Sequence, residues 1–162
     1  MNRITICRAK LSHSRLIWEW RNDSQTRAMS RKSDLISWEK HSQWFSNSLE
    51  NSGRYIYFSE NNGLPFGIAR FDLIDLEISS FEISIIVAPV FRGENLAHLL
   101  LHESLVKFNC DLPGDKLIIA DIKVDNLRSN LLFSKYGFKL IQQDKNLNQY
   151  SYTLTANNTY SL

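Results

Sequence analysis

The feature that most constrains the fold is the segment 81–122, which reads as a strand, a helix and a second strand. A β-branched run, FEISIIVAP, stops at Pro89, and a leucine-rich pattern of helical period occupies residues 92–108. KLIIADI (116–122) is then almost wholly apolar, as is typical of a strand buried on both faces. A strand, helix and strand in this order form a right-handed crossover with parallel strands. The sequence therefore predicts a β-α-β unit at its centre.

The remaining segments predict further strands and helices on both sides of this unit. Before it we expect a strand at 4–9, helices at 14–23 and 37–49, and a strand hairpin at 54–74. After it we expect a helix at 125–136 that ends at Gly137, and a hairpin within 138–155. We predict one domain, residues 1–162, of α/β class: a central mixed, mostly antiparallel sheet with a β-α-β core, flanked by helices.

Composition excludes several classes of protein. The chain has 162 residues, 43% of them hydrophobic, and a net charge of +2 without a Lys/Arg run, so a nucleic-acid partner is not expected. It shows neither an 18-residue apolar stretch nor the apolar region of a signal peptide, so we expect no membrane span and a cytoplasmic location.

Cysteines and histidines give no metal-binding pattern. Cys7 and Cys110 show no CxxC spacing, and we expect both to be buried thiols in a reducing compartment. His98 and His102 lie four residues apart without an HExxH context, so we expect exposed helix positions. No metal is predicted.

The turn RGENLA joins the strand to the helix and is a candidate anion site. A helix N-terminus offers unpaired N–H groups and the positive end of a dipole, which suit a phosphate. Gly93 and Ala97 leave room for close approach, Asn95 tolerates a left-handed conformation, and Arg92 adds positive charge. Glu94 is expected to face solvent. A turn that merely begins a helix stays an equal alternative on these residues alone.

Two motifs together resemble the GNAT superfamily of acyl-CoA N-acyltransferases. RGENLA after its strand resembles motif A, written Q/R-x-x-G-x-G/A. Residues 126–138, NLRSNLLFSKYGF, resemble motif B, N-x-x-S-x-x-L-Y-x-K-x-G-F. The two lie at the family's separation and on its elements, so the resemblance covers most of the chain.

The resemblance implies that the chain is an N-acetyltransferase that moves an acetyl group from acetyl-CoA to a primary amine by direct attack. Residues 54–138 would form the CoA-binding core, with main chain of the turn on the pyrophosphate and strand main chain on the pantetheine. The implied cofactor-binding residues are Ile86, Val87, Arg92, Gly93, Glu94, Asn95, Leu96, Ala97, Asn126, Ser129 and Phe133.

Two departures from the family pattern concern the chemistry. Asn95 replaces the usual glycine, and Phe133 replaces the tyrosine that is thought to protonate the leaving thiolate. Because phenylalanine cannot donate a proton, Ser134, Tyr136 or water are the candidate donors. Glu82 is the first candidate for the base that takes the amine proton, and a solvent-facing strand glutamate is the alternative. Asp121, Asp125 and His41 are weaker candidates, and a surface position is the more probable one for His41.

The N-terminal residues 1–50 are expected to bind the acceptor. The patterns WRND and ISxxxHxxWF resemble a GNAT branch that acetylates the amino group of nucleotide-linked amino sugars, as in the pseudaminic-acid pathway. The candidate acceptor-binding residues are Arg21, Asn22, Arg27, Trp38 and His41. Arginines suit a diphosphate and aromatic rings suit a sugar or base, but core tryptophans and arginines paired with nearby acids explain each residue equally well.

Other functions stay open at this point. Ribosomal-type protein N-terminal acetyltransferases share parts of the pattern, and Asn95 and Phe133 also fit a degenerate acyl-CoA-binding module. A polyamine acceptor would call for a strongly acidic cleft, and the N-terminal third has no acidic cluster. A homodimer through an edge strand near the C-terminus is also left open.

Overall fold

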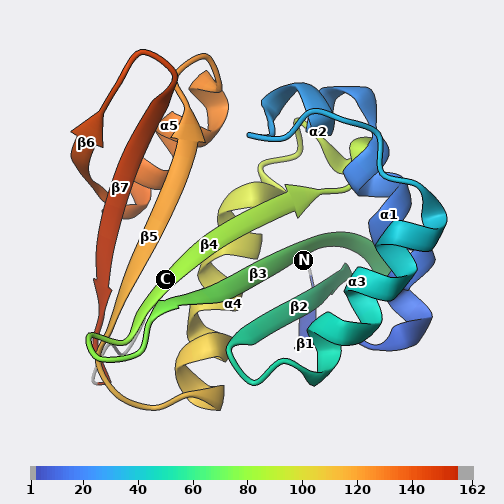
Figure 1. The fold of residues 1–162 in the computed structure, drawn as a ribbon, viewed down its shortest axis with the longest axis horizontal. Helices are drawn as coiled ribbons and strands as arrows, with labels where there is room; N and C mark the ends of the chain where they lie inside the picture. The colour runs from blue at the N-terminus through green and yellow to red at the C-terminus, as the bar shows by residue number, and fades with distance from the viewer. Residues whose placement is uncertain (1–2, 157–162) are drawn as a thin grey trace.

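The computed structural model describes residues 3–156, which form one continuous seven-stranded sheet flanked by helices (Figure 1). The strands are β1 (Ile4–Arg8), β2 (Arg54–Asn61), β3 (Leu64–Asp75), β4 (Ser80–Val87), β5 (Lys116–Lys123), β6 (Lys139–Gln143) and β7 (Leu147–Leu154). The helices are α1 (Ser14–Asn22), α2 (Ser24–Met29), α3 (Trp38–Glu50), α4 (Leu96–Asp111) and α5 (Leu127–Tyr136).

The sheet has the order β1-β2-β3-β4-β5-β7-β6. Only the β4–β5 pair is parallel among its neighbouring strands in residues 3–156, and α4 connects the two. The predicted mixed, mostly antiparallel sheet with a β-α-β core is therefore confirmed. No helix in this part of the chain is long and apolar enough to span a membrane.

The alternation of side chains along β2, β3 and β4 gives the sheet two different faces. One face packs on α4, through Tyr57, Ala69, Phe71, Ile83, Leu101, Leu105 and Phe108. The other packs on α1 and α3, through Ile17, Trp20, Phe45, Ile56, Phe58 and Ile68. Figure 1 shows α4 behind the sheet and α1 and α3 on its other side. Burying each large apolar side chain stabilises the fold by about 1.5–3 kcal/mol, so both layers are held in place.

The turn between β4 and α4 is longer than its sequence predicts. The strand ends at Val87, and the backbone of Pro89–Phe91 makes one 3-10 turn. The helix was expected from residue 92 but begins at Leu96, because Gly93 and Asn95 have φ angles of +90° and 57°, which a right-handed helix cannot contain. The expected ability of Asn95 to take a left-handed conformation is thus confirmed.

The short helix α2 was not expected. Asp23 caps it by accepting a hydrogen bond from the amide of Thr26 at 2.9 Å. Its six residues make less than two turns, too few to show an apolar period in the sequence.

The prediction of buried thiols is wrong. Cys7 lies on edge strand β1 and Cys110 lies near the C-terminal end of α4, and both are exposed. Cys7 follows the partly buried Ile6 and Cys110 follows the partly buried Asn109, and the strand or helical period turns each thiol outward.

Candidate active site

The sheet opens between β4 and β5. Their parallel pairing covers only Ser80–Glu82 and Leu117–Ile119. Beyond it β4 stays paired with β3 as far as Val87, and β5 stays paired with β7 over its whole length. The two strands therefore diverge after Glu82, and the β5-facing edge of β4 carries main-chain groups that its sheet neighbour does not use.

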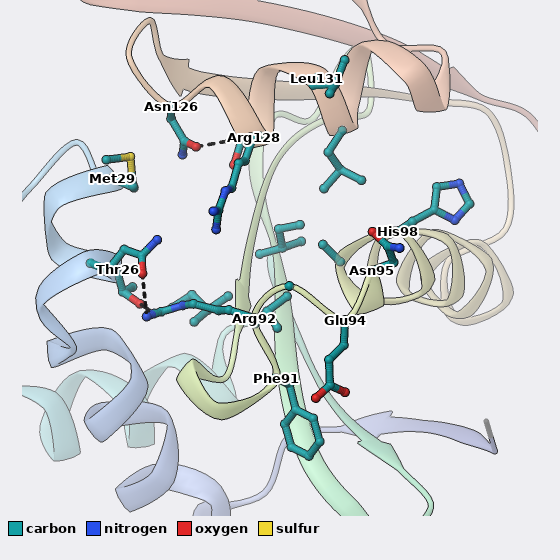
Figure 2. A pocket seen from close by; sticks show the side chains of 18 of the residues that line it. Thr26, Met29, Phe91, Arg92, Glu94, Asn95, His98, Asn126, Arg128 and Leu131 are labelled. Carbon is teal, nitrogen blue, oxygen red and sulfur yellow. Dashed lines mark hydrogen bonds between the residues drawn. The ribbon is translucent and has the colours of Figure 1, made fainter. Parts of the chain in front are cut away.

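A cavity of about 1010 Å³ lies beside this opening, and we call it the turn cavity because residues 91–95 form one wall. α2, the end of β4, the first turn of α4 and the α5 side chains form its other walls (Figure 2). Arg92, Arg128 and Lys135 give the lining positive charge, against the single carboxylate of Glu94. The first N–H groups of α4 have no intrahelical partner, and the side chain of Asn95 does not cap them. This arrangement suits an anionic ligand.

Arg92 fastens the turn to α2. One of its Nη atoms lies 2.5 Å from the carboxylate of Asp23 and donates to the hydroxyl of Thr26 at 2.7 Å. Figure 2 shows the side chain reaching away from the turn toward α2. The hydrogen bond from Arg92 holds the pKa of Asp23 below its usual value. The guanidinium is thus engaged within the protein, and the main chain of the turn faces the cavity.

Two motif B residues form the start of α5. Asn126 caps the helix by accepting a hydrogen bond from the amide of Ser129 at 3.2 Å, and both residues line the turn cavity. The cap explains the N-x-x-S spacing, because a capping side chain reaches the amide three residues on.

Nine of the eleven predicted cofactor residues line the turn cavity: Ile86, Val87, Arg92, Gly93, Glu94, Asn95, Ala97, Asn126 and Ser129. The side chain of Leu96 is instead buried beside Phe66 and Leu100 in the core. Phe133 packs edge-on against Phe138 and borders a second cavity. Any contact of Leu96 with the cofactor would therefore have to come from its main chain.

The second cavity, of about 840 Å³, lies on the α1–α3 side of the sheet, and we call it the carboxylate cavity. It shares wall residues with the turn cavity: Met29, Ser30, Ile85, Ile86, Asn126 and Ser129. The two cavities are therefore neighbours that meet at the opening between β4 and β5.

The two carboxylates of this cavity come from the diverging strands. Glu82 on β4 and Asp121 on β5 both contact Arg31, which donates to Asp121 at 3.0 Å and forms an ion pair with Glu82. Burial raises the pKa of Glu82, and Asp121 raises it further, whereas Arg31 opposes the change. A carboxylate in this cavity whose pKa is raised is suited to accept a proton from an amine.

The other charged side chains of this lining are cationic. They are Arg21, Arg31, Lys32, Lys40, Arg54 and Arg70. Arg21 donates through one Nη atom to the carbonyl of Lys32 at 2.6 Å, and its other Nη atom is buried without a hydrogen-bond partner among residues 3–156. Burial, then Arg70 and Arg27, lower the pKa of Arg21. This buried guanidinium nitrogen is a free donor that a water molecule or an anion can satisfy.

Two of the five predicted acceptor residues line the carboxylate cavity, Arg21 and His41. The expected surface position of His41 is wrong: the ring is buried, and Nε2 lies 2.9 Å from the carbonyl of Ser14. A carbonyl oxygen only accepts, so Nε2 carries the proton, and burial lowers the pKa of His41. His41 is therefore a neutral ring fixed in the wall.

The other three predicted acceptor residues hold the loop that leads from α2 to α3. The side-chain amide of Asn22 makes two hydrogen bonds to the main chain of Ile36, at 2.8 and 2.9 Å. Arg27 donates to the carbonyl of Ser33 at 2.9 Å, and Trp38 packs edge-on against Trp18. Asn22, Arg27 and Trp38 thus shape the loop 30–37, and none of them lines either cavity.

The candidate proton donors lie outside both cavities. Ser134 is exposed and donates to the carbonyl of Leu131 at 3.2 Å. The hydroxyl of Tyr136 lies 3.1 Å from Nδ1 of His102. His102 was expected to be exposed and is buried, because α4 turns that face toward α5. The geometry therefore gives neither hydroxyl a path to a leaving thiolate.

The sequence did not single out Arg31, Arg54 or Arg70. Two of them carry a readable signal, because Arg54 and Arg70 have the same strand alternation as the inward-facing Ile56 and Ile68. Both arginines also form ion pairs with Asp72, and the distance from Arg70 Nε to the Asp72 carboxylate is 2.7 Å. Arg31 lies in a loop, where no helical or strand periodicity shows which way its side chain points.

A sheet opened between two parallel strands, with one cavity at a helix N-terminus and a second cavity around a carboxylate pair, has the layout of a transferase that brings two substrates together. The family model of the acetyltransferase (GNAT) domain matches residues 3–139. The chain belongs to this family, and it is an acetyl-CoA-dependent N-acetyltransferase.

Solved structures share the fold at low sequence identity. The spermidine N-acetyltransferase of Vibrio cholerae, in complex with CoA and spermine, superposes with a TM-score of 0.83 at 15% identity over 93% of this chain and 95% of that one. A GNAT acetyltransferase of Streptococcus pneumoniae gives 0.73 at 13% identity, covering 94% and 99%. A domain from Methanocaldococcus jannaschii gives 0.78 at 19% identity, covering 95% and 100%. No curated protein matches the sequence significantly.

Proposed function

We propose that this enzyme acetylates the amino group of a nucleotide-linked amino sugar. The observation that carries the proposal is the charge of the carboxylate cavity, where six cationic side chains face two carboxylates. The diphosphate of a sugar nucleotide is a suitable partner for arginine, which binds phosphate oxygens with two N–H groups at once. A polyamine carries several positive charges and would meet repulsion here. The lining therefore favours an anionic acceptor, although the solved spermidine N-acetyltransferases have the same fold.

The proposed roles follow from the two cavities. Main-chain N–H groups from Arg92 to Ala97 hold the pyrophosphate of acetyl-CoA, and the unpaired edge of β4 near Ile86 and Val87 bonds its pantetheine arm. The acceptor amine approaches the thioester from the carboxylate cavity. The acceptor nitrogen enters as an ammonium ion, and Glu82 takes one of its protons. The freed lone pair forms the amide bond as the C–S bond breaks and CoA thiolate leaves. Water at the opening carries the second surplus proton from the nitrogen to that thiolate, because Ser134 and Tyr136 lie elsewhere.

Under this proposal Arg21 is the main residue that binds the acceptor. Its unpaired Nη atom and the neighbouring Arg70 supply donors for the acceptor's phosphates. The cytoplasmic location stays a prediction, as does a homodimer.

The test is a thiol-release assay with acetyl-CoA and one of three amines: a UDP-4-amino sugar, a peptide with a free N-terminus, or spermidine. We expect the sugar nucleotide to be turned over with the highest kcat/KM. Arg21→Ala should raise its KM about tenfold, the cost of one charge-assisted contact of roughly 1.4 kcal/mol. Arg15→Ala is the matched control, because Arg15 is exposed, pairs with Glu19 and lies outside both cavities. Highest activity on the peptide or on spermidine would reject the proposal.

A further inference from the structure

One cation of the carboxylate cavity already occupies the carboxylate pair. The two terminal nitrogens of Arg31 contact Asp121 and Glu82 separately, so a single guanidinium bridges the diverging strands. The second oxygen of Asp121 accepts a hydrogen bond from Gln149 at 2.9 Å. The pair that would attract a positively charged acceptor is therefore already occupied by a cation of the protein itself.

Arg31 lies between Glu82 and Asp121, where the nitrogen of an acceptor amine would have to bind to reach Glu82. Amines reach an enzyme mainly as ammonium ions at neutral pH, and the carboxylate that accepts the proton must lie within hydrogen-bond reach of the nitrogen. The other charged groups around the pair are mostly positive: Arg21 on α1, Lys32 on the loop, Lys40 on α3, Arg54 on β2 and Arg70 on β3. Asp72 on β3 is already paired with Arg54 and Arg70.

We propose that Arg31 is a specificity-determining residue, which acts as an internal competitor for the acceptor's ammonium group and thereby excludes polycationic acceptors. The Arg31 side chain is 45% exposed, whereas those of Glu82 and Asp121 are 22% and 17% exposed. Because Arg31 is the more exposed partner, its guanidinium can move away from the carboxylates when another anionic group is present to pair with it.

An anionic acceptor gives the displaced guanidinium a new partner. When such a molecule places its ammonium between Glu82 and Asp121, Arg31 moves from the carboxylates to the acceptor's phosphate and keeps its charge paired. A polyamine offers no such exchange, so its binding leaves Arg31 unpaired among other cations. This inference rests on the assignment of the carboxylate cavity to the acceptor, but not on the acceptor being a sugar nucleotide.

The experiment measures spermidine binding by calorimetry on the enzyme saturated with CoA, so that no turnover is needed. We expect weak binding to the wild type and a gain of about tenfold or more in Arg31→Ala, because the carboxylate pair becomes available. Arg31→Lys keeps a cation and should show a smaller gain. In the double variant Arg31→Ala/Glu82→Gln the gain should disappear.

Lys123→Ala is the matched control. Lys123 donates to the carbonyl of Ala28 at 2.8 Å, so its removal loosens the same segment and removes a positive charge without freeing the carboxylates. A gain in Lys123→Ala equal to that in Arg31→Ala, or no gain in Arg31→Ala, overturns the inference. Unchanged CoA affinity in each variant shows that the fold is intact.

The sugar-nucleotide assay separates this inference from the proposed function. If the wild type does not acetylate the sugar nucleotide but Arg31→Ala gains spermidine affinity, the acceptor identity fails and the role of Arg31 stands. If the sugar nucleotide is turned over and Arg31→Ala gains nothing, the role of Arg31 fails alone.

Discussion

The turn cavity and the carboxylate cavity differ in how they present charge. The turn cavity offers main-chain N–H groups at the start of α4, while Arg92 is bound to Asp23 and Thr26. The carboxylate cavity instead offers side-chain charge from four strands, two helices and a loop. Main-chain groups depend little on residue identity, whereas side-chain charges change with every substitution. The first cavity can thus keep one cofactor through large sequence change, and the second can change its acceptor.

The largest effect is expected from Gly93→Asp, which acts on the turn cavity. The glycine has φ +90°, and an added Cβ would meet no atom within 4 Å, so the substitution puts a strained, charged side chain beside the anion site. We expect CoA affinity, measured by calorimetry, to fall about a hundredfold or more. Gly63→Asp is the control, because Gly63 also has a positive φ and open space but lies in the β2–β3 turn. Near wild-type affinity in Gly93→Asp would refute the anion site.

A second change tests the carboxylate cavity alone. Glu82→Gln should lower kcat about a hundredfold, the usual contribution of a general base, and leave CoA affinity unchanged. Because burial raises the pKa of Glu82, wild-type kcat/KM should rise with pH through that raised pKa as the carboxylate loses its proton. The variant should lose this limb of the pH–rate profile. Glu77→Gln removes an exposed surface carboxylate and serves as control. A profile that Glu82→Gln leaves unchanged would exclude Glu82 as the base.

The smallest expected effect concerns Asn95. If the turn cavity binds through main chain, Asn95→Gly should keep CoA affinity within about twofold, since glycine takes the same left-handed conformation. Asn95→Val should lose about 1–2 kcal/mol of unfolding free energy, as should Asn62→Val at φ 52°. Only Asn95→Val should also weaken CoA binding. Denaturant unfolding and calorimetry measure the two quantities, and a large loss of affinity in Asn95→Gly would mean that the side chain itself binds CoA.

The sequence predicted the strands and most helices, because strand alternation and helical period are local patterns. Nine of the residues predicted to bind the cofactor line the turn cavity, and their cofactor role stays a prediction. Helix α2 was missed because it is too short to show a helical period in the sequence. Helix α4 begins later than predicted because Gly93 and Asn95 have positive φ angles. The burial of His41 and the exposure of Cys7 depended on which neighbours packed against them.

The sequence alone predicts the strands, the longer helices and the turn between β4 and α4, because each rests on a pattern within one element or between two consecutive elements. The carboxylate cavity is visible only in the tertiary structure. Arg31 is 51 positions from Glu82 and 90 positions from Asp121 in the sequence. Charges that far apart meet only after the sheet has formed. The packing of the sheet and loop then determines which charged side chains form ion pairs.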